Sequence, residues 1–464
     1  MLIETIRVVD TIAREAMLFA ATGLLIGGID DVMVDLLYLR HRWRGQGRSR
    51  LRLADLGVSA QPGRIAVFVA AWDEAAVIGG MVRTALARFD HHDYRLYVGV
   101  YPNDPATIDA VAAVAETDPR VRLVIGPSDG PTTKADNLNA MWRAALGDEA
   151  RDGHRLKAIV LHDAEDVVHP HELRVFDRLI DTHDVVQLPV LPLVKPGSRL
   201  VSGHYADEFA EHHTAQLPIR CALGAGMPLA GTGCAIARAM LADIAAERGG
   251  MPFDATSLTE DYELGLRIGE RGGRCLFARI GDGTAAGLVA VRAYFPATIP
   301  AATRQKARWM IGIALAGWDR TGWSSVPRWT DHWMRMRDRR APLAVLVLAV
   351  AYVAALAWGL GTGLHALAGT ALPTDRLATW LLLSTTALLG WRLAMRFACT
   401  ARCYGRREAI WSIPRFFVGN LIALVAAPRA IIRYVAMLRG ATPVWDKTRH
   451  EFPIGDTHAS AVPA

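Results

Sequence analysis

The sequence has few cysteines, and their spacing does not suggest that they organise the fold. Five occur in 464 residues, and no two of them form a CxxC pair. An odd number of widely separated thiols argues against a disulfide framework and against a cysteine-based zinc site. We therefore expect reduced thiols at Cys221, Cys234, Cys275, Cys399 and Cys403.

The sequence also lacks a long tract of lysine and arginine with interleaved aromatic residues, so nucleic acid is not an expected partner. The net charge is +6, 52% of the residues are hydrophobic, and the mean hydropathy is +0.18. The chain is too apolar for an ordinary soluble enzyme and too charged for a pure membrane bundle. Much of the basic excess lies beside apolar segments, which indicates contact with anionic phospholipid head groups.

Long apolar runs are confined to the two ends of the chain. Residues 16–39 have the length of a membrane span, although Asp30, Asp31 and Asp35 interrupt the run. The basic run at residues 40–52 places the following part of the chain in the cytoplasm by the positive-inside rule. Acidic residues before the apolar run, and the lack of a small-residue cleavage site, argue against a signal peptide.

The C-terminal part carries three further apolar stretches. Residues 341–364 and 378–397 are expected to span the membrane, and residues 329–340 form an expected interfacial helix. Residues 416–438 contain Pro428 and flanking arginines, so they could span the membrane or lie as a bent interfacial helix. We favour the interfacial alternative, which leaves the N-terminus outside and the C-terminus inside.

The central region reads as a soluble α/β domain. Residues 64–300 alternate short β-rich runs with stretches of helical periodicity, which predicts a mostly parallel sheet. Binding sites in such sheets form at the carboxyl ends of the strands. The expected strands are residues 64–72, 95–102, 121–127, 157–163 and 185–193, and the expected helices are residues 74–89, 107–117 and 135–146.

Three carboxylates follow one of the expected strands directly. Asp163, Glu165 and Asp166 lie at the end of the apolar run that closes the strand at residues 157–163. Carboxylates on a rigid strand end can hold Mg²⁺ or Mn²⁺, and such a cation would neutralise a diphosphate leaving group. A solvated acidic turn is the alternative, but the strand end favours a cation site.

A second acidic group lies in SLTEDYELGLRI, where Thr259 can serve as a helix N-cap. A pure capping role for Thr259, Glu260 and Asp261 is one interpretation. The other is that the two adjacent carboxylates offer a general base for an attacking sugar hydroxyl, and Asp261 is the preferred candidate.

Two further groups of residues could bind a nucleotide sugar. The segment RQKARWMIG offers Gln305, Arg308 and Trp309, in which the guanidinium suits phosphate and the indole suits a sugar ring. Alone, this segment would be interpreted as the start of a basic membrane-interface helix. The second group lies at strand ends and a helix start and could equally be structural caps; its members are Asp73, Glu74, Asp104, Lys134 and Asp136.

In this order, and followed by apolar segments, these motifs resemble the family 2 processive glycosyltransferases, which include cellulose, hyaluronan and chitin synthases. The resemblance covers residues 60–320 and rests on the D-x-D-like, T-E-D and Q-x-x-R-W motifs. GIDDVMVDLLY (28–38), YPNDPAT (101–107) and VWDKTRHEF (444–452) are most similar to one bacterial subgroup. That subgroup includes the inner-membrane glycosyltransferase of a phage-adsorption apparatus.

The resemblance implies a GT-A, Rossmann-like domain inserted between transmembrane helices, an inverting displacement, and bound Mg²⁺ or Mn²⁺. The second acid of the D-x-D pair is a glutamate here, which leaves open whether Glu165 or Asp166 reaches the metal. The implied roles place Asp73 and Asp104 beside the nucleoside, Asp163 and Glu165 at the metal and diphosphate, Asp261 as the base, and Gln305, Arg308 and Trp309 at the diphosphate and acceptor.

The expected function is therefore transfer of a sugar from a nucleotide donor, with UDP as the expected nucleotide, to a growing polysaccharide at the bacterial inner membrane. An envelope export partner could accompany it. One alternative is single-sugar transfer to a lipid-linked acceptor, and another is a catalytically silent membrane receptor or scaffold. The expected organisation is a transmembrane segment at 1–45, a cytoplasmic catalytic domain at 60–320, interfacial and transmembrane helices at 321–440, and a cytoplasmic tail at 441–464.

Overall fold

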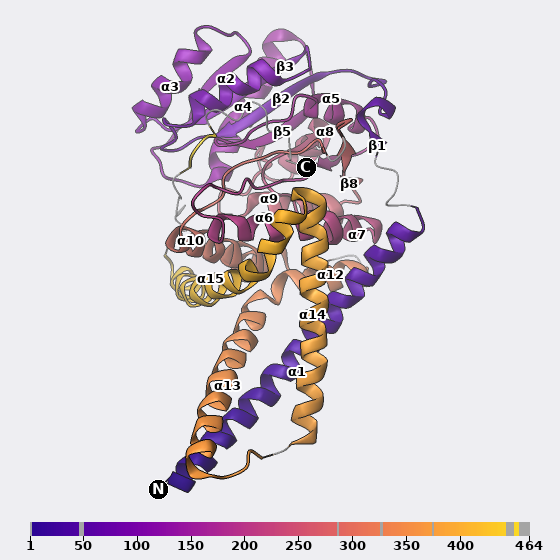
Figure 1. Cartoon of the computed structure of the whole chain (residues 1–464). Coiled ribbons are helices and arrows are strands. Elements are labelled where there is room, and N and C mark those ends of the chain that lie inside the picture. Colours follow the sequence, from indigo (N-terminus) through magenta and orange to yellow (C-terminus); the bar gives the residue numbers. More distant parts are fainter. Residues whose placement is uncertain are drawn as a thin grey trace.

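The computed structural model shows an α/β domain from which long helices project (Figure 1). The structure describes residues 2–45, 51–284, 287–324, 328–373, 375–441 and 450–453.

A seven-stranded, mostly parallel sheet forms the centre of the α/β domain, as the alternating pattern predicts. Its strand order is β4-β3-β2-β5-β7-β6-β8, and β7 runs antiparallel to β5 and β6. A short parallel pair, β1 (Leu51–Arg52) and β9 (Ile280–Gly281), lies apart from it. The main strands are β2 (Arg64–Ala70), β3 (Tyr94–Val100), β4 (Val121–Ile125), β5 (Leu156–Asp163), β6 (Val185–Gln187), β7 (Cys234–Ala237) and β8 (Cys275–Phe277).

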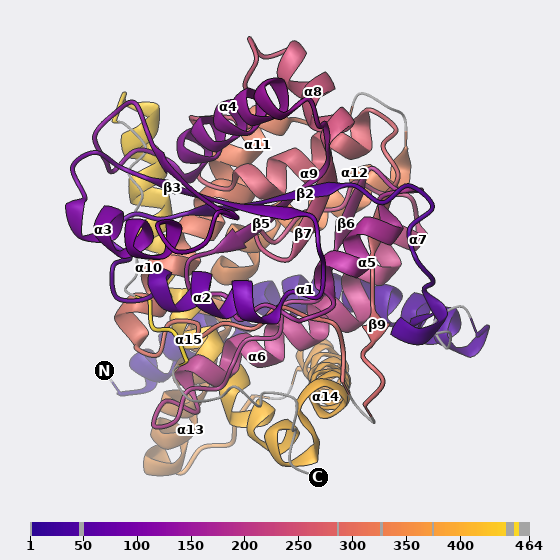
Figure 2. The same cartoon turned by 90° about the horizontal axis from the view of Figure 1, so that it is seen from above.

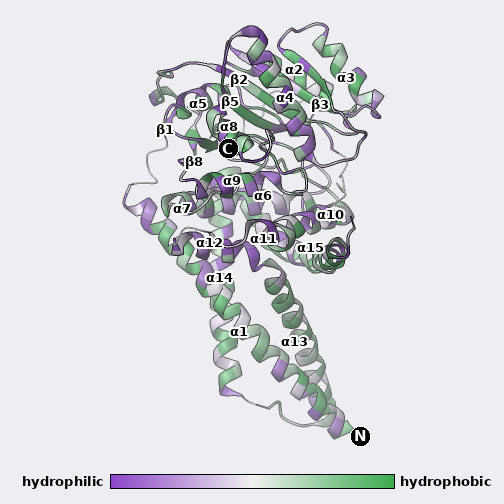
Figure 3. Cartoon of the chain, turned by 180° about the vertical axis from the view of Figure 1, so that it is seen from behind, coloured by the Kyte–Doolittle hydropathy of each residue, from purple (hydrophilic) through white to green (hydrophobic). Residues whose placement is uncertain are grey.

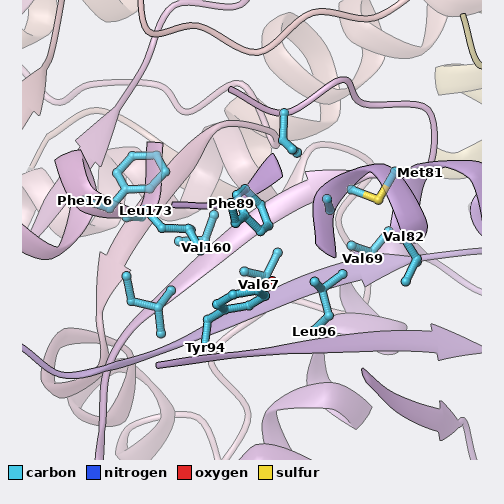
Figure 4. Packing of buried hydrophobic residues seen from close by; sticks show 14 of the residues in the cluster. Val67, Val69, Met81, Val82, Phe89, Tyr94, Leu96, Val160, Leu173 and Phe176 are labelled. Carbon is cyan, nitrogen blue, oxygen red and sulfur yellow. The ribbon is translucent and has the colours of Figure 1, made fainter. Parts of the chain in front are cut away.

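Helices cover both faces of this sheet (Figure 2). Side chains alternate along β2, so that Val67 and Val69 pack on one face while Ala66 and Phe68 pack on the other. Figure 4 shows the first of these two layers around Val67 and Val69. Burial of each large apolar side chain contributes about 1.5–3 kcal/mol. The first face carries α2 (Ile78–Arg88), α3 (Pro105–Ala115) and α5 (Glu172–Leu179), and the second carries α4 (Lys134–Asp152), α8 (Arg238–Ala246) and α9 (Glu260–Glu270).

One expected strand is much shorter than the sequence pattern suggests. The apolar run at residues 185–193 pairs as a strand only over β6, which ends at Gln187. Pro189 and Pro192 follow, and proline cannot donate to a strand ladder. The chain beyond β6 makes isolated bridges instead, including Val190 with Val291.

Three long helices project from the same side of the α/β domain, and α1 packs along both α13 and α14 (Figure 1). Hydrophobic residues dominate α13 in particular (Figure 3). Each of these helices is longer than the apolar run from which it was predicted, because it continues into the flanking residues. The bounds are α1 (Leu2–Trp43), α13 (Ala341–Ala368) and α14 (Arg376–Tyr404).

A fourth helix, α15 (Arg406–Leu438), is also long and apolar enough to cross a membrane by length and composition. It lies across the underside of the α/β domain, where it packs against α6 (Val201–Glu211), α10 (Ile299–Met310) and α14 (Figure 1). The remaining helical segments are η1 (Leu53–Asp55), the π-helical η2 (His212–Gln216) and η3 (Ile311–Leu315), α7 (Leu217–Ala222), α11 (Ala316–Thr321) and α12 (Trp329–Arg339).

The acidic residues that interrupt the first apolar run face protein. Asp30 and Asp31 of α1 form ion pairs with Arg337 and Arg340, at the end of α12. Trp333 Nε1 donates to Asp30 Oδ1 over 2.6 Å. Because carboxylates near a bilayer are costly unless paired, these contacts explain how α1 carries them.

Candidate functional site

A cavity of about 530 Å³ opens between the carboxyl end of β5, the starts of α4 and α9, and the face of α10. Most of the residues predicted for the site line it, although they come from distant parts of the chain. Those residues are Lys134, Asp163, Glu165, Asp166, Glu260, Asp261, Gln305, Arg308 and Trp309.

Lys134 is the cation at the centre of the acidic group. It is the first residue of α4, and its Nζ lies 2.5 Å from Asp163 Oδ1 and 3.1 Å from the carbonyl oxygen of Gly231. Burial alone would lower the pKa of Lys134, but Asp163, Glu260 and Asp261 together raise it well above its usual value. Lys134 is therefore firmly protonated, and it lies between carboxylates of two chain segments, the end of β5 and the start of α9.

Glu260 and Asp261 begin α9 and face this lysine. Burial, followed by the neighbouring Asp261, raises the pKa of Glu260 to about 7. Burial also raises the pKa of Asp261, while Lys134 opposes that rise. The Asp261 Oδ1 atom accepts the Tyr262 N–H over 2.8 Å. These surroundings raise the pKa of both carboxyl groups, and perturbed carboxyl groups of this kind are typical of acid–base sites.

Thr259 occupies the N-cap position of α9, as the sequence predicts, but its side chain makes no capping hydrogen bond. Its buried Oγ1 has no hydrogen-bond partner within the described part of the chain. A purely structural capping role therefore does not account for the Thr-Glu-Asp motif.

Asp166 and Glu165 have different surroundings. The Asp166 carboxylate accepts the Asp163 N–H over 2.9 Å and the Thr232 hydroxyl, and it pairs with His162 Nδ1 over 2.8 Å. His162 also contacts Glu172 over 2.6 Å, so Asp166 belongs to a buried internal network. Glu165 instead lies 3.2 Å from His450 Nδ1 and lines the cavity, and burial raises its pKa. Of the two, Glu165 is the better placed to bind a ligand.

The Gln-x-x-Arg-Trp residues lie along α10 and face the cavity. The buried Gln305 Oε1 has no hydrogen-bond partner among the described residues. Trp309 packs edge-on against Tyr205, with ring centroids 5.9 Å apart, and lies beside Phe295. The motif therefore forms one wall of the site and is more than the start of a basic interfacial helix.

Four predicted residues do not line the cavity. Asp104 caps α3 by accepting the Thr107 N–H over 3.3 Å, and it also accepts the Asp73 N–H over 2.6 Å. Asp136 lies in the first turn of α4, where its N–H donates to Thr133 Oγ1. The contacts of Asp104 match the capping alternative, whereas the N-cap of α4 is Thr133 and not Asp136. Glu74, the fourth, reaches the cavity rim through His450.

His450 is the main residue that the sequence reasoning did not assign to the site. Its Nδ1 lies 2.6 Å from Glu74 Oε1 and 3.2 Å from Glu165 Oε2. Among the described residues, the potential ligand atoms of these three side chains all lie within 4.8 Å of one another. The sequence motif that contains it, VWDKTRHEF, supported the resemblance to a bacterial subgroup, but no role in the site was assigned to any of its residues.

Arg392 and Arg396 of α14 also line the cavity and were not predicted. Both contact Glu211, with a distance of 3.2 Å from Arg396 Nε to Glu211 Oε2. The sequence feature that could have indicated them is the presence of two arginines within the apolar run at residues 378–397. They extend the cavity from the acidic group to the side from which the long helices project.

The comparisons with known proteins agree with this architecture. The family model described as "Glycosyltransferase like family 2" matches residues 62–312. Two similar curated proteins are bacteriophage adsorption protein B of Escherichia coli K12 and bacteriophage N4 adsorption protein B of Escherichia coli O157:H7. Each is 32% identical over 95% of this chain, and the chain spans 62% of the length of each.

A similar solved structure is the mannosyltransferase PcManGT from Pyrobaculum calidifontis, in complex with GDP-Man and Mn²⁺. It has a TM-score of 0.53 and 17% sequence identity, and the match covers 91% of this chain and 99% of that chain. The likeness confirms the expected GT-A-like mixed α/β fold.

Proposed function

From the premise that the chain belongs to the glycosyltransferase-like family 2, we propose that it is an inverting membrane glycosyltransferase. It would move a sugar from a nucleotide donor, with UDP as the favoured nucleotide, to a growing polysaccharide. The observation that carries this proposal is the convergence of Lys134, Asp163, Glu260 and Asp261 on one cavity. The fold shared with a mannosyltransferase is consistent with it.

The donor site would include a divalent cation, either Mg²⁺ or Mn²⁺. Asp163 and Glu165 fit such a cation, because they present carboxylate oxygens from the end of a rigid strand. When bound, the cation would neutralise charge on the departing diphosphate. Asp166 contributes indirectly, because its buried contacts fix the turn that carries Glu165.

The protein's own residues would divide the remaining work. Asp261 Oδ1 is engaged by the backbone of α9, so Oδ2 is the atom that would accept the acceptor hydroxyl proton. Lys134 favours the ionised form of this carboxylate, since it opposes the rise that burial causes in the Asp261 pKa. Arg308 would hold diphosphate oxygens, while Gln305 and Trp309 would orient the sugars.

The test is donor turnover and product formation by the purified chain with Mg²⁺ or Mn²⁺ and a panel of nucleotide sugars. Asp261→Asn should lower the transfer rate by about 10²–10⁴-fold while donor binding is retained. The exposed Asp243→Asn variant of α8 serves as the matched control and should transfer normally. Full transfer by Asp261→Asn would show that another group is the base.

A second candidate function is single-sugar transfer to a lipid that carries a phosphate. The observation that favours it is the pair Arg392 and Arg396, which line the cavity on the side of the projecting helices. A lipid phosphate could enter there from the bilayer surface. Product size separates the two candidates, because a polysaccharide synthase makes long chains and a lipid transferase makes one defined adduct.

A catalytically silent receptor or scaffold is the remaining alternative, and a failure to bind any nucleotide sugar by calorimetry would favour it. We place the enzyme in the bacterial inner membrane. Residues 60–320 would form the cytoplasmic catalytic domain, with spanning segments in 1–45 and 321–440 and a tail at 441–464. An envelope export partner is compatible with relatives named for phage adsorption.

A further inference from the structure

The chain returns to the α/β domain after the last long helix. Phe452 joins the apolar layer between the sheet and α2, beside Gly80. Glu451 forms an ion pair with Lys195 over 2.5 Å. These two contacts fix His450 between them and the cavity, more than ten residues beyond the end of α15. The segment is therefore anchored on the domain and does not simply extend away as a tail.

The position of His450 matters because of the two groups that it meets. Its Nδ1 lies between Glu74, which follows β2, and Glu165, which follows β5. Both carboxylates are largely buried, and the imidazole is itself only one-fifth exposed. Since β2 and β5 are adjacent parallel strands, their carboxyl ends hold the two glutamates on a common edge.

The spacing of these groups suits one cation. Their potential ligand atoms lie within 4.8 Å of one another. Two ligands on opposite sides of one ion, each about 2.0–2.6 Å away, are separated by a similar span. Carboxylate oxygens suit Mg²⁺ and Mn²⁺ alike, whereas an imidazole nitrogen suits transition metals better than Mg²⁺.

The two neighbouring carboxylates differ in what they can add. Asp163 uses Oδ1 to bind Lys134 and can offer Oδ2 to the cation, whereas Asp166 belongs to the buried network with His162. Glu165 therefore has additional potential ligands in Glu74 and His450.

We propose that Glu74, Glu165 and His450 together bind the divalent cation of the donor site, with Mn²⁺ preferred over Mg²⁺. This inference rests on the proposed transferase function and adds a ligand from beyond the family's catalytic region. The C-terminal segment thereby becomes part of the donor site, because its His450 supplies the nitrogen ligand.

The experiment measures Mn²⁺ binding to the full chain in detergent, without donor, by electron paramagnetic resonance. His450→Ala should weaken Mn²⁺ binding by about 10–100-fold, and Glu165→Gln should have a similar effect. Mg²⁺ should compete less well against the unaltered chain than against His450→Ala. Asp243→Asn is the control, because it alters an exposed carboxylate on α8 outside the cavity, and it should bind Mn²⁺ normally.

Pulsed electron paramagnetic resonance identifies the ligand atoms directly, so its result cannot be explained by a folding defect. Bound Mn²⁺ should show hyperfine coupling to an imidazole nitrogen, and ¹⁵N labelling of histidine should change that coupling. Phe452→Ala, which removes the anchor but keeps the imidazole, should weaken binding without abolishing the coupling. Absence of nitrogen coupling, or unchanged affinity in His450→Ala, would overturn the inference. Nitrogen coupling without any sugar transfer would instead overturn the proposed function and leave the metal site standing.

Discussion

Lys134 Nζ lies 2.5 Å from Asp163 Oδ1, which joins the first residue of α4 to the last residue of β5. The two residues are brought together because parallel strands and the helices between them place strand ends and helix starts at one edge. The same lysine also acts electrostatically on Glu260 and Asp261. One lysine thus acts on carboxyl groups from two separate elements, β5 and α9.

Replacement of Lys134 by a neutral residue should change the pH dependence of sugar transfer. Lys134 lowers the pKa of Asp261, which burial raises, so Lys134→Met should raise that pKa further. A base must be deprotonated to act, and the acidic limb of the kcat/KM profile should therefore move to higher pH. Lys134→Arg keeps the charge and should show a smaller displacement. An acidic limb at the same pH in both variants would contradict this role for Lys134.

Gly231 is expected to be essential for the position of Asp261. Its φ is +72°, and a Cβ added there would lie 2.6 Å from Asp261 Oδ2. Gly231→Ala should therefore displace the base and lower the transfer rate by about tenfold or more, because small displacements of reacting groups are costly. Gly249→Ala is the control, since φ is +65° there but the added Cβ meets nothing within 4 Å. Equal transfer rates in the two variants would contradict the positional role of Gly231.

Substitution of Asp166 should lower the stability of the fold, whereas substitution of Glu165 should lower the affinity for the cation. Asp166→Asn disrupts a buried network with His162 and Thr232, and loss of one partner from a buried ion pair costs about 3–5 kcal/mol. Its thermal unfolding midpoint in detergent should fall clearly. Glu165→Gln should unfold near the normal temperature while losing cation affinity. A stable Asp166→Asn variant with poor Mn²⁺ binding would reverse the two assignments.

The sequence was informative where local pattern and topology coincide. Alternating strands and helices predicted the sheet, and the ends of its elements suggested Asp163 and Lys134 as separate candidate ligands, which the structure brings into contact. The D-P-x-T pattern after β3 supported either a cap or a nucleotide ligand, and the structure shows Asp104 acting as a cap. Local pattern could not separate these roles, because both use the same carboxylate.

The position of His450 could not be predicted from the sequence. It lies nearly three hundred residues from Glu165 in the chain, beyond several long helices, and no periodicity connects the two. Their contact depends on where α15 ends and on the packing of Phe452 against the domain. The arginines of α14 are similar, because their hydropathy marks them as unusual but not as part of a cavity.

The position of α15 leads to a prediction about membrane topology. Arg415 of this helix is fully buried, with its guanidinium beside Asp207 and Glu408, and α15 lies against the domain (Figure 1). If α15 crossed the bilayer instead, Arg415 would lose its pair with Asp207, and the helix would carry Arg429 and Arg433 with it, at a cost of about 2.5–3.5 kcal/mol for each arginine near the centre.

A reporter fused after Ala441 should therefore read as cytoplasmic. The control is a reporter inserted near Thr370, in the connection between α13 and α14, which should read as external because α13 leads away from the domain (Figure 1). Alkaline phosphatase activity at the second site and fluorescence of a cytoplasmic reporter at the first would agree with an interfacial α15. Phosphatase activity at both sites would require α15 to span the membrane, and His450 could then not reach Glu165 from the cytoplasmic side.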